Sequence, residues 1–204
     1  FLYMETGSTP MHIGSLSIYD QSTAPDGHVT FKQILNFFDK RLYKARAFRQ
    51  RLVKVPLSLD HPYWIEDPDF DLEFHVRHIA LPKPGDWRQL CIETARIHAR
   101  PLDMRKPLWE AWVIEGLDNV KGMPKGSFAL LTKIHHAAID GVSGAEIAEA
   151  IHDLTPESDV DEPLNKWQPE RIPTGVELLT RSLARSVSAP MKFGRIIKRS
   201  APSL

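Results

Sequence analysis

The stretch that decides the fold comprises residues 128–144, which read FALLTKIHHAAIDGVSG. Its first half, residues 128–134, is almost entirely apolar, as expected of a central strand that is buried on both faces. Two adjacent histidines, His135 and His136, follow this segment. Apolar residues at helical spacing then run from Ser143 to about residue 154. The stretch therefore predicts a buried strand, a loop that carries both histidines, and an amphipathic helix.

Strands and helices alternate on the N-terminal side of this stretch, which predicts an α/β layered domain. Strands are expected at residues 11–19, 52–57, 74–81 and 109–115, and helices at residues 31–43 and 86–99. Thr30 belongs to the residue types that cap helices, so we expect the first of these helices to begin directly after it. Residues 64–72 are acidic and aromatic and are expected to form a loop.

The composition excludes several classes of protein. The chain has 204 residues, of which 42% are hydrophobic, enough for a sizeable core in one domain with an appendage. Lysine plus arginine equals aspartate plus glutamate at 26 each, which argues against a dedicated nucleic-acid binder. With one cysteine, Cys91, the chain can form no internal disulfide. Its apolar runs are shorter than the roughly 18 residues of a membrane-spanning helix, so we expect a cytoplasmic protein.

The sequence changes character after residue 154, where we place a domain boundary. Residues 156–161 are acidic, and Pro163, Pro169 and Pro173 follow, a composition typical of a linker. From Leu178 to the end there is no acidic residue, and basic residues are mixed with apolar ones. Two interpretations stay open: a helical connector that packs on a partner domain, or a basic surface that attaches peripherally to the inner membrane or to lipid droplets.

The two histidines are candidates for acid–base chemistry. Neighbouring side chains at the end of a strand point in different directions, so only one of the two rings faces a given cavity. Histidine is the side chain best suited to accept a proton near neutral pH, and a hydroxyl group becomes a good nucleophile only when a base takes its proton. Asp140 can orient an imidazole directly or fix the loop by pairing with an arginine, and Gly141 permits a tight turn.

Three interpretations of the histidine pair compete. The first is a structural pair in the core or on the surface, and the second is a metal site with Asp140. Adjacent strand residues do not readily chelate one ion, and no cluster of further ligands joins them in the sequence, so we expect no metal. The third is a general base in an acyl-transfer site, and the complete string favours it.

Three separated motifs resemble the bacterial wax ester synthase/diacylglycerol acyltransferases. His135-His136-x-x-x-Asp140-Gly141 matches the HHxxxDG motif of the CoA-dependent acyltransferase superfamily, which includes chloramphenicol acetyltransferase and the condensation domains of peptide synthetases. Pro107-Leu108-Trp109 matches the PLW motif of the family, and residues 10–14, PMHIG, resemble a segment near its N-terminus. The resemblance covers at least residues 10–154.

The resemblance implies a fold and a domain organisation. The fold would be a chloramphenicol-acetyltransferase-like two-layer sandwich, in which helices flank a mixed sheet. Residues 1–154 would form the N-terminal acyltransferase domain, and residues 155–204 would connect it to a C-terminal domain, its partner. Members of this family have two similar halves with the active-site tunnel between them, so this chain would supply the half that holds the base.

The resemblance also implies an O-acyltransferase of neutral-lipid synthesis. His136 would be the general base acting on the hydroxyl of a long-chain alcohol, giving a wax ester, or of a diacylglycerol, giving a triacylglycerol. The acyl donor would be acyl-CoA as a co-substrate, with no cofactor. His135 would support the loop, and Asp140 would hold its geometry. The choice of acceptor and of chain length depends on the shape of the tunnel, which the sequence does not specify.

Further residues receive roles from the same resemblance. Gly141 and Ser143 lie at the start of the predicted helix, where backbone N–H groups can stabilise an oxyanion or bind substrate. His12, Gly14, Ser143 and Gly144 are candidates for lining the substrate channel.

The PLW string and the overall function each have a second interpretation. Pro107, Leu108 and Trp109 are apolar, so they either pack at the entry of a strand or form a wall near the tunnel. The alternative functions are a carrier-protein-dependent acyltransferase or condensation enzyme of the same superfamily, and a non-catalytic lipid-droplet-binding protein. The PLW string argues against the first, and the intact His136 and Asp140 argue against the second.

Overall fold

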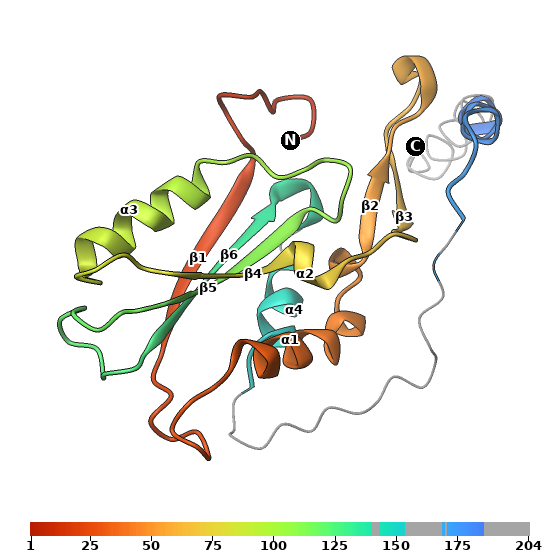
Figure 1. Cartoon of the computed structure of the whole chain (residues 1–204). Helices are drawn as coiled ribbons and strands as arrows, with labels where there is room; N and C mark the ends of the chain where they lie inside the picture. Colours follow the sequence, from red (N-terminus) through yellow and green to blue (C-terminus); the bar gives the residue numbers. More distant parts are fainter. Residues whose placement is uncertain (140–142, 154–168, 170, 186–204) are drawn as a thin grey trace, which may run out of the picture.

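Four strands form one mixed sheet in the order β1-β6-β5-β4 (Figure 1). The central strand β6 (Phe128–His135) pairs antiparallel with β1 (His12–Tyr19) on one side and with β5 (Trp109–Glu115) on the other. The edge strand β4 (Val76–Ala80) runs parallel to β5. The expected mixed sheet in an α/β domain is therefore confirmed, with the predicted strand of residues 128–134 at its centre.

The structure, a computed structural model, describes residues 1–139, 143–153, 169 and 171–185, and for residues 143–146 it describes the backbone alone. The predicted domain boundary at residue 154 and most of the predicted linker lie outside this part of the chain. Among the helices in the described ranges, none has the length and apolar character needed to cross a membrane.

Helices cover both faces of the sheet. Because successive strand residues point to opposite faces, β5 contributes to two cores. Ala111 and Val113 pack with helices α1 (Phe31–Asp39) and α4 (Ser143–Ala150), whereas Trp112 and Ile114 pack with α3 (Trp87–His98). Figure 1 shows α3 on one side of the sheet and α1 with α4 on the other. Burial on both faces explains why β5 and β6 are nearly continuous apolar runs.

Capping residues set the starts of the two longer helices. The Thr30 side chain accepts a hydrogen bond from the backbone N–H of Gln33, whose own side chain returns to Thr30, and Asp86 and Gln89 form the same box at α3. The predicted start after Thr30 is confirmed. The α1 helix ends at Asp39 rather than near residue 43, and two short 3₁₀ turns, Leu42–Lys44 and Arg46–Phe48, follow it.

Two expectations for residues 50–72 were wrong. The strand expected at 52–57 is β2 (Gln50–Val53), which ends earlier because Pro56 begins a 3₁₀ turn. Part of the acidic, aromatic segment expected to be a loop is β3 (Tyr63–Glu66), which pairs antiparallel with β2 in a separate hairpin. Tyr63, Trp64 and Ile65 are residue types that favour strands, and their pairing with β2 outweighs the acidic residues that follow them.

The segment expected to be one strand at residues 74–81 has two parts. A single helical turn, α2 (Leu72–His75), begins after Asp71, whose side chain accepts a hydrogen bond from the backbone N–H of Glu73. The strand β4 then begins at Val76. The local cap at Asp71 therefore shortens the strand at its N-terminal end.

A helix at residues 175–185 packs against the tip of the β2–β3 hairpin (Figure 1). Leu178 is buried, and the Ser182 hydroxyl donates a hydrogen bond to the carbonyl oxygen of Leu59 at 3.4 Å. The Arg185 guanidinium lies 3.9 Å from the Asp60 carboxylate. This part of the predicted basic tail is therefore helical and docked on the hairpin tip.

Candidate active site

The histidine loop follows the central strand directly. Strand β6 ends at His135, a 3₁₀ turn spans His136–Ala138, and α4 begins at Ser143. Asp140 and Gly141, which were predicted to hold and turn this loop, lie outside the described residues, and only the backbone is described for Ser143 and Gly144.

The His135 ring is engaged through both nitrogens. Its side chain is fully buried, and Nδ1 accepts a hydrogen bond from the backbone N–H of Ala137 at 2.9 Å. The proton must then reside on Nε2, which donates to the Glu5 carboxylate at 2.9 Å. Neither nitrogen of His135 is left to exchange a proton with a substrate, and the ring holds the first turn of the loop in place.

The His136 ring has a different environment. Its backbone N–H donates to the carbonyl oxygen of Met11 at 2.8 Å, which fixes the start of the turn. The half-buried ring stacks on Phe1 with centroids 4.9 Å apart and an interplanar angle of 18°. No residue in the described ranges forms a hydrogen bond with a ring nitrogen of His136. His136 therefore retains its proton-accepting capacity within this part of the chain.

The N-terminal segment contributes two residues to the site that were not predicted from the sequence, Phe1 and Glu5. The Phe1 ring stacks on the His136 ring. The Glu5 carboxylate accepts a hydrogen bond from His135, although 130 positions separate Glu5 from His135. The Glu5 side chain is only 11% exposed. The signal that could have found it is its short distance in sequence from Met11, whose backbone binds the histidine turn.

His12 and Gly14, the channel candidates on β1, face the end of α3. His12 Nε2–H donates to the carbonyl oxygen of His98 at 2.6 Å, and burial lowers the pKa of His12. A Cβ at Gly14 would lie 2.6 Å from the His98 ring. Lys133, which is fully buried, donates to the carbonyl oxygen of Ile97 at 2.9 Å. These groups dock α3 on the sheet, and a role in the channel stays a prediction.

The PLW string packs in the core beside the histidine loop, with Pro107, Leu108 and Trp109 all buried. The Trp109 ring stacks on His75 at 4.7 Å, and its indole N–H donates to the carbonyl oxygen of Phe48 at 2.9 Å. The backbone N–H of His135 donates to the carbonyl oxygen of Leu108 at 3.0 Å. The string thus packs at the entry of β5 and also fixes the end of β6 that presents the histidines.

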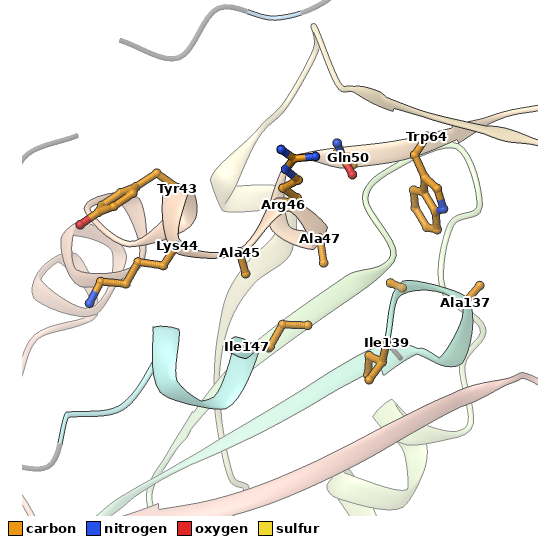
Figure 2. Close-up of a pocket in the computed structure, with 11 residues that line it drawn as sticks. Tyr43, Lys44, Ala45, Arg46, Ala47, Gln50, Trp64, Ala137, Ile139 and Ile147 are labelled. Atoms are coloured by element: carbon orange, nitrogen blue, oxygen red, sulfur yellow. The ribbon is translucent and has the colours of Figure 1, made fainter. Parts of the chain in front are cut away.

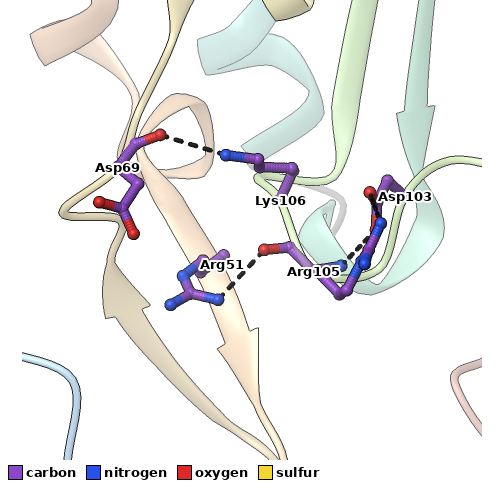
Figure 3. Close-up of polar contacts among 5 residues, drawn as sticks. All are labelled: Arg51, Asp69, Asp103, Arg105 and Lys106. Carbon is purple, nitrogen blue, oxygen red and sulfur yellow. Dashed lines mark hydrogen bonds and ion pairs between the residues drawn. The ribbon is translucent and has the colours of Figure 1, made fainter.

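Polar contacts hold the loop before the PLW string against the hairpin (Figure 3). Arg51 on β2 donates to the carbonyl oxygen of Arg105 at 3.2 Å, and the Lys106 ammonium donates to the carbonyl oxygen of Asp69 at 3.2 Å. The Asp103 carboxylate binds the Arg105 guanidinium at 2.8 Å within the loop. The hairpin, a separate sheet, is therefore anchored to the body that carries the histidines.

A cavity of about 590 Å³ opens beside the turn that begins at His136 (Figure 2). One wall consists of residues 43–47 with Gln50 and Trp64, and the other of residues 137–139 with Ile147. Figure 2 shows Trp64 projecting from the hairpin toward the turn at Ala137.

A second cavity of about 460 Å³ lies between the N-terminal segment, the hairpin and the loop after Pro101. Glu5, which binds His135, is part of its wall, and Leu52, Val55 and Leu102 supply apolar surface. The second cavity therefore adjoins the acid that binds His135. No cluster of three or more metal-binding side chains occurs in the described part of the chain.

Solved structures share this fold. The chain matches the wax ester synthase/diacylglycerol acyltransferase from Marinobacter aquaeolei VT8 with a TM-score of 0.60 and 33% identity, over 78% of this chain and 38% of that chain. It matches the first condensation domain of the calcium-dependent antibiotic synthetase with a TM-score of 0.51 and 18% identity, over 69% of this chain and 32% of that one. The second similarity concerns the fold alone.

Curated relatives extend the similarity at the sequence level. A putative diacylglycerol O-acyltransferase of Mycobacterium tuberculosis H37Rv is 38% identical over 196 residues, which cover 96% of this chain and 39% of the relative. A probable diacylglycerol O-acyltransferase of the same strain, tgs3, is 39% identical over 183 residues, or 90% of this chain and 64% of the relative. The chain thus spans less than two thirds of either relative.

The sequence model of the wax ester synthase/diacylglycerol acyltransferase catalytic domain matches residues 1–202, nearly the whole chain. The match includes the PMHIG, PLW and HHxxxDG strings. The described residues of these three strings lie together at one end of the mixed sheet. The chain belongs to the wax ester synthase/diacylglycerol acyltransferase family.

Proposed function

We propose that this chain carries the general base of an O-acyltransferase that moves a fatty acyl group from acyl-CoA to a hydroxyl group. The observation that carries the proposal is the difference in hydrogen bonding between the His135 and His136 rings. His135 uses both nitrogens for hydrogen bonds inside the fold, whereas no described residue bonds the ring nitrogens of His136. The names of the relatives support a long-chain alcohol or a diacylglycerol as the acceptor.

In the proposed reaction, His136 takes the proton of the acceptor hydroxyl as its oxygen attacks the thioester carbonyl carbon. A tetrahedral oxyanion forms and is stabilised by N–H donors. When the carbon–sulfur bond breaks, the His136 imidazolium returns its proton to the leaving sulfur, which releases CoA and the ester. General base catalysis of this kind is typically worth about 10²–10⁴-fold in rate.

The neighbouring residues have supporting roles in this proposal. His135 orients the start of the loop, and Asp140 holds its geometry. Backbone N–H groups at Gly141 and Ser143, where α4 begins, bind the oxyanion or the substrate. A C-terminal domain of the same protein completes the tunnel around His136 and is the partner of this chain.

We also propose a peripheral site of action at the cytoplasmic face of the inner membrane or at lipid droplets, where both acceptors reside. The supporting surface combines the hairpin tip with the helix at residues 175–185. Leu57, Val176 and Leu183 are 85%, 71% and 61% exposed on it, and Arg181 and Arg185 add positive charge. Exposed apolar side chains with basic neighbours favour a surface that contains anionic lipid.

The proposed function is tested by ester formation from radiolabelled palmitoyl-CoA, with hexadecanol and with dipalmitoylglycerol as acceptors. Full-length protein is compared with its His136→Ala variant and with a matched control, His28→Ala, in which an exposed histidine is removed. We expect His136→Ala to lower turnover by at least about 10²-fold, and His28→Ala to leave it unchanged.

The product identifies the preferred acceptor. Ester formation at the wild-type rate by His136→Ala would remove His136 as the base. If folded wild-type protein forms no ester with either acceptor, the neutral-lipid function is wrong, and a carrier-protein-bound thioester becomes the donor to test.

A further inference from the structure

The cavity beside the histidine turn carries positive charge that no described acid compensates. Its described wall includes two exposed cations, Lys44 and Arg46, and none of the wall residues that the structure describes is an aspartate or glutamate. Neither cation forms an ion pair with any acid in the described ranges. By contrast, Arg41 and Arg51 in the same region pair with Asp153 and Asp67. Two exposed cations on the described wall of one cavity favour an anionic ligand.

The rest of the cavity suits a ligand with an aromatic ring and a chain that leads to His136. Trp64 is 36% exposed and projects from β3 toward the turn at Ala137 (Figure 2), so its ring face is available for stacking. The opposite wall is apolar, with Ile139 and Ile147, and begins at Ala137, the residue after the proposed base. A ligand seated here therefore lies directly beside the histidine turn.

The second cavity has the opposite character. Its charged wall residues are Glu5, Asp60 and Lys54, so acids outnumber bases, and much of the remaining wall is apolar. A phosphate would be repelled by this wall, whereas an uncharged, apolar substrate would not. The charge difference between the two cavities therefore distinguishes the two substrates of the proposed reaction.

We propose that the cavity at residues 43–47 receives the phosphorylated nucleotide end of acyl-CoA. Lys44 and Arg46 contact its phosphates, and Trp64 packs on its adenine ring. The pantetheine arm then runs along the apolar wall at Ala137, which brings the thioester to His136. This inference rests on the proposed function, in which acyl-CoA is the donor, and adds the residues that bind it.

The test is calorimetric titration of full-length protein with CoA, which measures binding without turnover. The double variant Lys44→Glu/Arg46→Glu should raise the Kd for CoA at least tenfold, because two favourable phosphate contacts become repulsive. Trp64→Ala should raise it roughly fivefold or more, the lower range for loss of base stacking on an aromatic ring. The matched control is Lys125→Glu, an exposed cation in the turn before β6, which should stay within twofold of wild type.

Steady-state kinetics should show the same specificity. The KM for palmitoyl-CoA should rise in the double variant, while the KM for dipalmitoylglycerol and kcat stay close to wild type. The KM for palmitoyl-CoA should also depend less on salt, because fewer phosphate contacts remain to be screened. Melting curves check the fold, and Lys44→Gln/Arg46→Gln replaces the charge reversal if that variant does not fold.

Three outcomes would overturn the inference. If the double variant binds CoA within twofold of wild type while wild type forms ester, the cavity is not the donor site and the proposed function stands. If the variant loses binding to phosphatidylglycerol vesicles but not to CoA, the cations bind a lipid headgroup instead. If wild type neither binds CoA nor forms ester, the proposed function falls together with the inference.

Discussion

At the scale of single residues, the site depends on how two neighbouring histidines are made different. His135 is the last residue of β6 and lies on the face that α3 covers, where Glu5 and a backbone N–H engage its two nitrogens. His136 begins the 3₁₀ turn, and its ring stacks on Phe1. The fold thus uses one imidazole as a structural hydrogen-bonding group and leaves the other for chemistry.

Glu5 is the residue on which this difference depends most directly. We predict that Glu5→Ala, which leaves the buried His135 N–H without its acceptor, lowers stability by about 1–3 kcal/mol. We also predict a lower kcat with unchanged KM values, because the histidine turn loses its orientation while substrate contacts remain. Chemical denaturation and steady-state kinetics measure the two effects.

The conservative variant Glu5→Gln separates positioning from simple loss of stability. The glutamine amide oxygen can still accept a hydrogen bond from His135 Nε2–H, so kcat should recover in part. Equal kcat values for wild type and Glu5→Ala would show that His135 needs no partner for catalysis.

At the scale of secondary structure, α1 and α4 are joined at their C-terminal ends. Arg41, two residues after α1, binds Asp153, three residues after α4, through two hydrogen bonds, one of them 3.0 Å long. The Arg41 side chain is 1% exposed and also lies over the Phe37 ring at 4.0 Å. This pair fixes the far end of the helix that follows the histidine loop.

We predict that Asp153→Ala destabilises the protein by about 1–3 kcal/mol, because it leaves the Arg41 guanidinium buried without its acceptor. The matched control is Arg96→Ala, which removes a solvent-exposed pair with Glu93 and should leave the denaturation midpoint unchanged. The midpoint of urea unfolding measures both. Equal midpoints for wild type and Asp153→Ala would mean that the link between the helices is energetically neutral.

At the scale of the whole molecule, the hairpin forms a second body beside the sheet. Arg51 connects it to the loop before the PLW string, and the helix at 175–185 packs on its tip (Figures 1 and 3). The hairpin therefore links the histidine side of the molecule with the exposed apolar surface at Leu57 and Leu183.

We predict that Leu57→Asp/Leu183→Asp reduces binding of full-length protein to phosphatidylglycerol vesicles several-fold, because apolar contacts are replaced by charges that anionic lipid repels. Vesicle flotation measures the bound fraction. Met123→Asp, at a partly exposed position in the turn before β6, is the matched control and should bind as wild type does. Unchanged flotation of the double variant would exclude this surface as the membrane contact.

Features that depend on short-range interactions could be predicted from the sequence. The strand–loop–helix unit around His135 and His136 and the helix starts after Thr30 and Asp86 follow from apolar periodicity and from caps that act within three residues. The three motif strings were sufficient to predict the family, because each is a local string.

Contacts between distant segments could not be predicted from the sequence and are seen only in the folded chain. The strand β3 contains Tyr, Trp and Ile, which favour strands, but its partner β2 lies in another segment and is identified only by the pairing itself. Glu5 binds His135 across 130 positions, and residues 43–47 line one cavity with Ala137 only because the two 3₁₀ turns after α1 place them beside the histidine turn. Contacts of this kind depend on packing between elements, which propensity and spacing along the chain do not encode locally.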